Sequence, residues 1–105
     1  MSARVLIADD DRAIRDALTR ALGLEGYDVV QASDGNTALS LIESMQPDVA
    51  ILDVMMPNID GLTVCRVLRA ERNRLPVLML TARTETPDRV AGLVPGDVAP
   101  GPVLL

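Results

Sequence analysis

The 105-residue sequence contains no lysine and no histidine, so all ten of its basic residues are arginines. Without histidine there is no imidazole acid or base, no histidine metal ligand and no Ser-His-Asp triad, and without lysine there is no amine nucleophile. Cys65 is the only cysteine, which excludes an intrachain disulfide and a thiolate metal cluster. Since no cationic histidine or lysine exists to lower its pKa, this thiol is expected to be a buried, inert small hydrophobe.

Aromatic residues and long apolar runs are also scarce. Aromatic residues make up 1% of the chain and hydrophobic residues 49%, so the core has to be built from aliphatic side chains and methionine. No run approaches the ~20 apolar residues of a membrane span, and no apolar signal segment begins the chain. The net charge of −5 provides no basic footprint for nucleic acid or an anionic membrane. The sequence therefore predicts one cytoplasmic domain with no membrane or direct nucleic-acid partner.

Short apolar runs alternate with amphipathic segments along the chain. Strands are predicted at residues 4–8, 27–31, 49–52 and 76–80. Helices are predicted from Asp11 to about Leu24, from residues 33–35, after Gly61, and from Thr86-Pro87. The first of these helices has one apolar face, formed at helical spacing by Ile14, Ala17, Leu18, Ala21 and Leu22, and a polar face formed by Arg12, Arg15, Asp16, Thr19 and Arg20. This alternation indicates βαβ units that form a parallel sheet with helices on both faces, a three-layer α/β fold.

Carboxylates follow two of the predicted strands. Asp9 and Asp10 come after the first strand, and Asp53 comes after the third. If these strands are neighbours, as at the switch point of a doubly wound sheet, three acidic groups converge in one crevice. An acidic run is usually a solvated turn and a strand-end aspartate usually caps one, but their joint placement favours a site. Because the clustered carboxylates repel one another, we expect them to bind a cation. Ligation by oxygen alone favours Mg²⁺, with Mn²⁺ as a substitute.

A hydroxyl group, that of Thr81, follows the fourth predicted strand and reaches the same edge of the sheet. A carboxylate, a hard cation and a hydroxyl donor together suit phosphoryl transfer. Asp53 is then the nucleophile, and Thr81 hydrogen-bonds the phosphorylated product. No general base is needed, because a carboxylate is already ionised at neutral pH.

Taken together, these motifs resemble the receiver domains of bacterial response regulators. The resemblance is carried, over about residues 4 to 93, by VLIADDDRAIRDAL, SDGNTAL, PDVAILDVMMPNIDG and PVLMLTAR. It implies a flavodoxin-like fold with strand order 2-1-3-4-5, in which Asp53 accepts a phosphoryl group from a sensor histidine kinase. It implies that Mg²⁺ is held by Asp9, Asp10, Asp53 and the Met55 backbone carbonyl. By the same resemblance, Thr81 follows the phosphoryl group and moves the loop into the fourth helix, and the module is a phosphoacceptor with at most autophosphatase activity.

Residues 94–105, VPGDVAPGPVLL, depart from the family pattern. In the family a segment similar to G-A-D-D-Y-x-x-K-P-F follows the fourth helix, and here its aromatic and lysine positions fall on Pro100 and Val103. The receiver core is therefore expected at residues 1–93, followed by a Gly/Pro-rich tail in which the fifth strand and fifth helix are degraded or missing. No output domain is expected within the chain, because the family's winged-helix domain would lie beyond Leu105.

The altered tail weakens the expected fold. A missing fifth helix forfeits a gross ~6–12 kcal/mol of apolar burial, comparable with the ~5–15 kcal/mol net stability of a typical domain. Part of one sheet face would be exposed, which allows a homodimer. Three explanations account for the tail: divergence to a module that no longer switches, truncation, or a reading-frame slip near codon 94. The Gly, Pro, Ala, Val and Leu composition of the tail favours the last two.

Two alternative functions remain open at this point. The missing lysine leaves a phosphorylation-incompetent interaction domain as the alternative, with Arg83 as a candidate substitute for that lysine. A hydrolase of the haloacid-dehalogenase type also begins with a strand that ends in D-x-D, a pattern that Asp9 to Asp11 superficially fits. That motif, however, requires threonine or valine where Ala13 stands.

Overall fold

The structure is a computed structural model that describes residues 2–80 and 103–104 of the chain. In chain order the elements are β1 (Arg4–Ala8), α1 (Arg12–Leu24), β2 (Asp28–Ala32), α2 (Gly35–Met45), β3 (Val49–Asp53), α3 (Gly61–Ala70), β4 (Val77–Leu80) and β5 (Val103–Leu104). The predicted order of the first four strands and the first three helices is confirmed. The helix predicted from Thr86-Pro87 and most of the tail, residues 94–102 and 105, lie outside the described residues.

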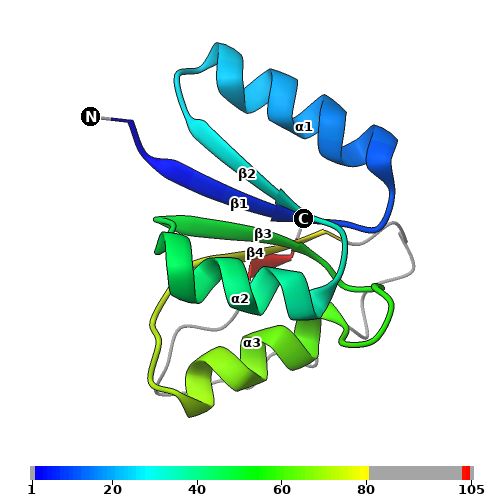
Figure 1. Ribbon diagram of the computed structural model, residues 1–105, viewed down its shortest axis with the longest axis vertical. Coiled ribbons are helices and arrows are strands. Elements are labelled where there is room, and N and C mark those ends of the chain that lie inside the picture. Colours follow the sequence, from blue (N-terminus) through cyan, green and yellow to red (C-terminus); the bar gives the residue numbers. More distant parts are fainter. Residues whose placement is uncertain (1, 81–102, 105) are drawn as a thin grey trace.

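The strands form one parallel sheet in the order β2-β1-β3-β4-β5. Helix α1 lies on one face of this sheet, and α2 and α3 lie on the other (Figure 1). This is the predicted three-layer, flavodoxin-like arrangement. The fifth strand pairs with β4 through Leu78↔Val103 and Met79↔Leu104, so the last strand is reduced to two residues rather than missing.

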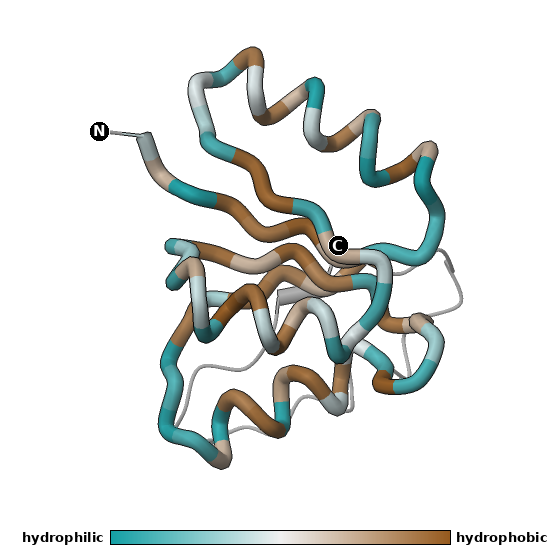
Figure 2. Tube along the Cα trace, in the orientation of Figure 1, coloured by the Kyte–Doolittle hydropathy of each residue, from teal (hydrophilic) through white to brown (hydrophobic). Residues whose placement is uncertain are grey.

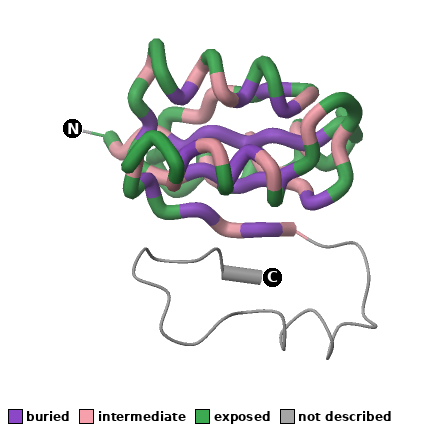
Figure 3. The backbone as a smooth tube through the Cα atoms, turned by 90° about the horizontal axis from the view of Figure 1, so that it is seen from below, coloured by how far each residue is buried: buried purple, intermediate pink, exposed green. Residues whose placement is uncertain are grey.

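Apolar side chains on both faces of the central strands form the core. Strands β1 and β3 are mostly brown in Figure 2, and the central strands of the sheet are largely purple in Figure 3, which marks them as hydrophobic and buried. On the face covered by α2 and α3, the largest fully buried side chains are Leu6, Leu52, Val64, Leu68 and Met79. Cys65 of α3 is buried in the same cluster, as predicted, and burial raises the pKa of its thiol.

The face covered by α1 is packed less completely. Its buried cluster consists of Val5, Ile7 and Ile51, with partly buried side chains around it. Helix α1 has no buried residue, and Ile14 is 39% exposed. Among the described residues α1 is the only helix on this face, and it rests on the sheet through Leu18 and Leu22.

Each described helix begins at an aspartate that follows a strand or loop. The side chain of Asp11 accepts hydrogen bonds from the Ala13 and Ile14 N–H groups, and those of Asp34 and Asp60 cap α2 and α3 in the same way. These caps place the helix N-termini at the edge of the sheet where the parallel strands end. None of the helices in the described part of the chain has both the length and the apolar character needed to cross a bilayer.

Candidate functional site

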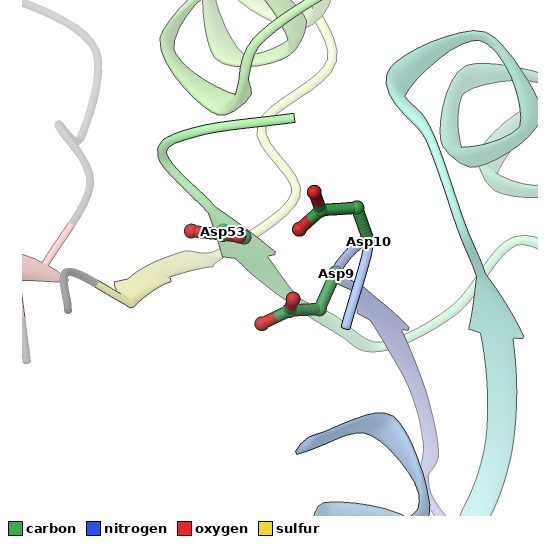
Figure 4. A group of neighbouring side chains, drawn as sticks. All are labelled: Asp9, Asp10 and Asp53. Carbon is green, nitrogen blue, oxygen red and sulfur yellow. The ribbon is translucent and has the colours of Figure 1, made fainter. Parts of the chain in front are cut away.

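The carboxyl ends of β1 and β3 lie side by side in the sheet. Ala8 of β1 is paired with Leu52 of β3, so the residues that follow them, Asp9 and Asp53, stand at the same level. Carboxylate oxygens of Asp9, Asp10 and Asp53 all lie within 4.8 Å of one another, and Figure 4 shows the three side chains gathered at these adjacent strand ends. The predicted convergence of the three side chains is confirmed.

Asp9 is the innermost of the three, with only 2% of its surface exposed. One carboxylate oxygen, Oδ1, accepts a hydrogen bond of 2.8 Å from the Asp11 N–H. Its backbone N–H donates to the Ala32 carbonyl of β2 at 3.1 Å, and its own carbonyl accepts a bond of 2.7 Å from the Arg15 guanidinium. Asp10, in contrast, is exposed. The cluster therefore has a buried, hydrogen-bonded member and a solvent-facing member at consecutive positions directly after β1.

Asp53 occupies the end of β3 and is half-buried. Its Oδ1 accepts a hydrogen bond of 3.2 Å from the Met55 N–H. The next residue, Val54, donates its N–H to the Leu80 carbonyl at 3.1 Å and accepts a hydrogen bond from the Gly61 N–H at 3.0 Å. The backbone that follows Asp53 is therefore tied to β4 and to the start of α3.

Two glycines bring α2 and α3 close to this edge. A Cβ atom on Gly61 would collide with the Asp53 carbonyl, and one on Gly35 would collide with the Ile59 carbonyl in the loop between β3 and α3. Neither position has room for a side chain, since the clashing atoms belong to the backbone. The loop that follows Asp53 is thus clamped between the first residues of α2 and α3.

Burial and mutual repulsion perturb the ionisation of the cluster. Burial raises the pKa of Asp53 from its ordinary value of 3.8 to about 6, and the negative charges of Asp9 and Asp10 add to this, opposed by the Met55 N–H. Burial also raises the pKa of Asp9, against the lowering effect of the Asp11 N–H. Two carboxylates at the same sheet edge are therefore costly to ionise together in the absence of a cation.

The donor set fits a hard divalent cation. Three carboxylates supply oxygen ligands, and the sequence has no histidine that could add a nitrogen ligand. Within residues 2–80, none of the three carboxylates forms an ion pair with an arginine, whereas the exposed Asp16 pairs with Arg12 at 3.6 Å. A bound divalent cation would neutralise this concentrated charge, and oxygen-only ligation favours Mg²⁺ over transition metals.

The structure tests the roles of the other predicted site residues only in part. Thr81 and Arg83 lie outside the described residues. The side chain of Met55 is 68% exposed, and its N–H is the group that contacts Asp53, so the metal-binding role of its carbonyl stays a prediction. The sequence reasoning missed Arg15, which it assigned to the polar face of the first helix. Its contact with the Asp9 carbonyl depends on how α1 crosses the sheet, for which the sequence has no local signal.

Comparison with known proteins agrees with this geometry. The family model described as "Response regulator receiver domain" matches residues 5–98. The response regulators MprA of Mycolicibacterium vanbaalenii and Mycobacterium tuberculosis are each 52% identical over 107 residues, an alignment that covers 100% of this chain and 46% of the relative. The chain thus spans less than half the length of these curated relatives.

Solved structures show the same relationship. The receiver domain of the Francisella response regulator 1452 has a TM-score of 0.83 and 33% identity, covering 98% of this chain and 84% of its own. The response regulator TrrA from Thermotoga maritima, solved in complex with Mg²⁺-BeF, has a TM-score of 0.80 and 31% identity, covering 98% and 86%. The sheet order, the paired strand ends and these similarities agree, and the chain belongs to the response regulator receiver domain family.

Proposed function

We propose that this chain is the receiver module of a two-component phosphorelay, and that its Asp53 accepts a phosphoryl group from a sensor histidine kinase. The observation that carries this proposal is the position of Asp53 within 4.8 Å of the carboxylates of Asp9 and Asp10. A nucleophilic carboxylate beside two further carboxylates suits a reaction in which a cation offsets the charge of the incoming phosphoryl group. The family membership supports the same role.

In this proposal Asp9, Asp10, Asp53 and the Met55 carbonyl hold Mg²⁺. Once bound, Mg²⁺ neutralises charge on the phosphoryl oxygens. The raised pKa values of Asp9 and Asp53 and the absence of an arginine partner within residues 2–80 support this donor set. The Thermotoga relative was solved with Mg²⁺-BeF, which favours the same ion here.

The chain's own groups supply the rest of the reaction. An Asp53 carboxylate oxygen forms the new bond to phosphorus, while the bond from phosphorus to the kinase histidine nitrogen breaks and that nitrogen keeps the electron pair. No base is required, because Asp53 with a pKa of about 6 is mostly ionised at neutral pH. Thr81, which follows β4, is proposed to hydrogen-bond the transferred group. Any autophosphatase activity would be loss of this acyl phosphate to water.

A second candidate function is an interaction domain that keeps the receiver fold but does not switch. One specific observation favours it, because the sequence has no lysine to contact the phosphoryl group. Arg83 is a candidate substitute, although its fork is longer and differently shaped from an ammonium group. Under either function we propose a cytoplasmic location and a kinase partner, and the partly buried Leu78 and Leu80 allow a homodimer.

Intact-mass measurement after incubation with a small phosphodonor and Mg²⁺ tests the proposal. The wild-type chain should gain the mass of one phosphoryl group, Asp53→Asn should gain none, and chelation of Mg²⁺ should abolish labelling. Asp16→Asn is the matched control, because Asp16 is an exposed aspartate on α1, and it should be labelled like the wild type. Equal labelling of wild type and Asp53→Asn would refute Asp53 as the acceptor, and labelling at Asp9 would instead support the hydrolase.

Labelling and switching are separate readouts. A wild-type chain that binds Mg²⁺ normally but gains no mass would favour the interaction domain over the phosphoacceptor. Backbone amide spectra recorded before and after labelling would show whether resonances beyond the acidic cluster shift, as a switch requires.

A further inference from the structure

A hydrogen-bond network behind the acidic cluster joins three elements of the fold. Arg15 of α1 is half-buried, and its Nη1 donates to the Asp9 carbonyl at 2.7 Å. Its Nε donates to Oε1 of Gln31 in β2 at 3.2 Å. The amide of Gln31 in turn donates to Oγ1 of Thr19, one turn further along α1, at 2.7 Å. One guanidinium therefore connects the end of β1 to α1 and β2.

We infer that Arg15 is a positioning residue for the metal-binding carboxylates, an inference that rests on the proposed function. The carbonyl that Arg15 holds belongs to the peptide group between Asp9 and Asp10. A displacement of this peptide group would move the Cα atoms of both residues and carry their side chains away from the edge that they share with Asp53. A charge-assisted hydrogen bond to a part-buried carbonyl is stronger than a neutral one, so Arg15 resists that displacement.

The position of the network excludes direct contact with the phosphoryl group. Strand β1 lies between β2 and β3 in the sheet, and Asp53 belongs to β3. The Asp9 N–H donates to Ala32 of β2, and Arg15 also holds Gln31 of β2. Arg15 therefore acts on the β2 side of β1, away from Asp53, and reaches the reacting atoms only through Asp9 and Asp10.

An electrostatic role and a positioning role for Arg15 predict opposite changes in the affinity for a divalent cation when this arginine is removed. If the positive charge of Arg15 acted on the site only by repulsion, its removal would tighten the binding of a divalent cation. If Arg15 positions the carboxylates, its removal loosens them and weakens binding. Groups that orient metal ligands typically change metal affinity by about tenfold or more when they are removed, which is large enough to exceed the electrostatic effect of one partly exposed charge.

The test is the Mg²⁺ affinity of the full chain, measured by titration calorimetry, with Mn²⁺ binding followed by electron paramagnetic resonance as a second readout. Arg15→Ala should weaken both affinities by about tenfold. Arg15→Lys should fall between this variant and the wild type, because an ammonium group lacks the fork that reaches two acceptors. Gln31→Ala should weaken binding less than Arg15→Ala, without any change in net charge.

Arg20→Ala is the matched control, since Arg20 is an exposed arginine on the same helix and its loss changes the net charge by the same amount. Its Mg²⁺ affinity should be unchanged or slightly tighter. An Arg15→Ala chain that folds and binds Mg²⁺ as tightly as Arg20→Ala would overturn the inference and leave the proposed function intact. Should Arg15→Ala not fold, unchanged affinity in Gln31→Ala and Arg15→Lys would overturn it equally. A wild-type chain with no Mg²⁺ affinity would overturn both proposals.

Discussion

A carboxylate oxygen of Asp53, the last residue of β3, lies within 4.8 Å of one of Asp9, the residue that follows β1. Asp9 is almost completely buried and Asp53 is half-buried, so water compensates little of the repulsion between them. In the absence of a cation, the repulsion between these negative charges lowers the free energy of unfolding of the protein.

Removal of the Asp53 charge should therefore stabilise the metal-free protein. Asp53→Asn is expected to raise the free energy of unfolding at pH 7 by about 1–2 kcal/mol, less than the full linkage energy because solvent reaches part of the side chain. Urea unfolding in the presence of a chelator measures this change. Asp16→Asn, which removes an exposed aspartate paired with Arg12, should change stability by less than about 0.5 kcal/mol. A destabilised Asp53→Asn chain would contradict the repulsion.

The stability of the metal-free protein should fall as the pH rises from about 4 to above 6. Asp53 has a folded-state pKa of about 6, above the ordinary value of 3.8, so the folded state binds this proton more tightly than the unfolded state. The stabilisation from protonated Asp53 is fully present below about pH 4 and is lost as the pH rises through 6. The raised pKa of Asp9 acts in the same direction.

Two helix caps have the opposite pH dependence but in a different range. Hydrogen bonds from Thr37 and Thr63 lower the pKa values of Asp34 and Asp60, so the stability that these caps contribute is lost only as the pH falls below about 4. Urea unfolding between pH 5 and 7 should therefore isolate the acidic cluster. The fall in stability across that range should be smaller in Asp53→Asn, and an identical fall in both chains would show that another group is responsible.

Bound Mg²⁺ should neutralise the charges of the acidic cluster, and it should compete with protons for the same carboxylate oxygens. A concentration of 100 times the dissociation constant should stabilise the folded chain by about 2.7 kcal/mol. The affinity should increase as the pH rises through 6, because Asp53 has to lose its proton to become a ligand. Thermal unfolding at several Mg²⁺ concentrations, at pH 5.5 and 7.5, measures both effects. A stabilisation that persists in a chain with both Asp9→Asn and Asp53→Asn would place the ion elsewhere.

The parts of the fold with a strong local pattern could be predicted from the sequence. The apolar runs before Asp9 and Asp53 identify two strands that are buried on both faces, and parallel βαβ topology then requires their carboxyl ends to share one edge. The aspartate caps of α1 and α2 are equally local, since Asp11 and Asp34 each accept from an N–H two or three residues ahead. Both kinds of prediction depend on neighbours in sequence or on a topology with few alternatives.

Features that depend on packing between distant elements could not be predicted. Helical spacing identifies an apolar face in α1 but not how far the sheet covers it, and Ile14 on that face is 39% exposed. The role of Arg15 depends on its distance from Asp9 and Gln31, and an arginine on a polar helix face is usually solvated. Strand β5, which the sequence predicts to be degraded or missing, has two residues, too few for an alternating pattern, and the prolines and glycines before it indicate a loop.

The loop after Asp53 is clamped between α2 and α3, and alanine substitutions at two glycines test how far this clamp fixes Asp53. A Cβ atom on residue 61 collides with the Asp53 carbonyl, so the end of β3 has to move in Gly61→Ala. This variant should therefore be destabilised by about 1–3 kcal/mol and should bind Mg²⁺ more weakly. Gly23→Ala is the control: Gly23 lies in α1 with nothing within 4 Å of its added Cβ, so alanine should stabilise the helix by about 0.5–1 kcal/mol. Urea unfolding and Mg²⁺ titration of both variants compare them directly. Equal stability in the two variants would mean that the backbone at Gly61 relaxes freely, in which case close approach does not fix the position of Asp53.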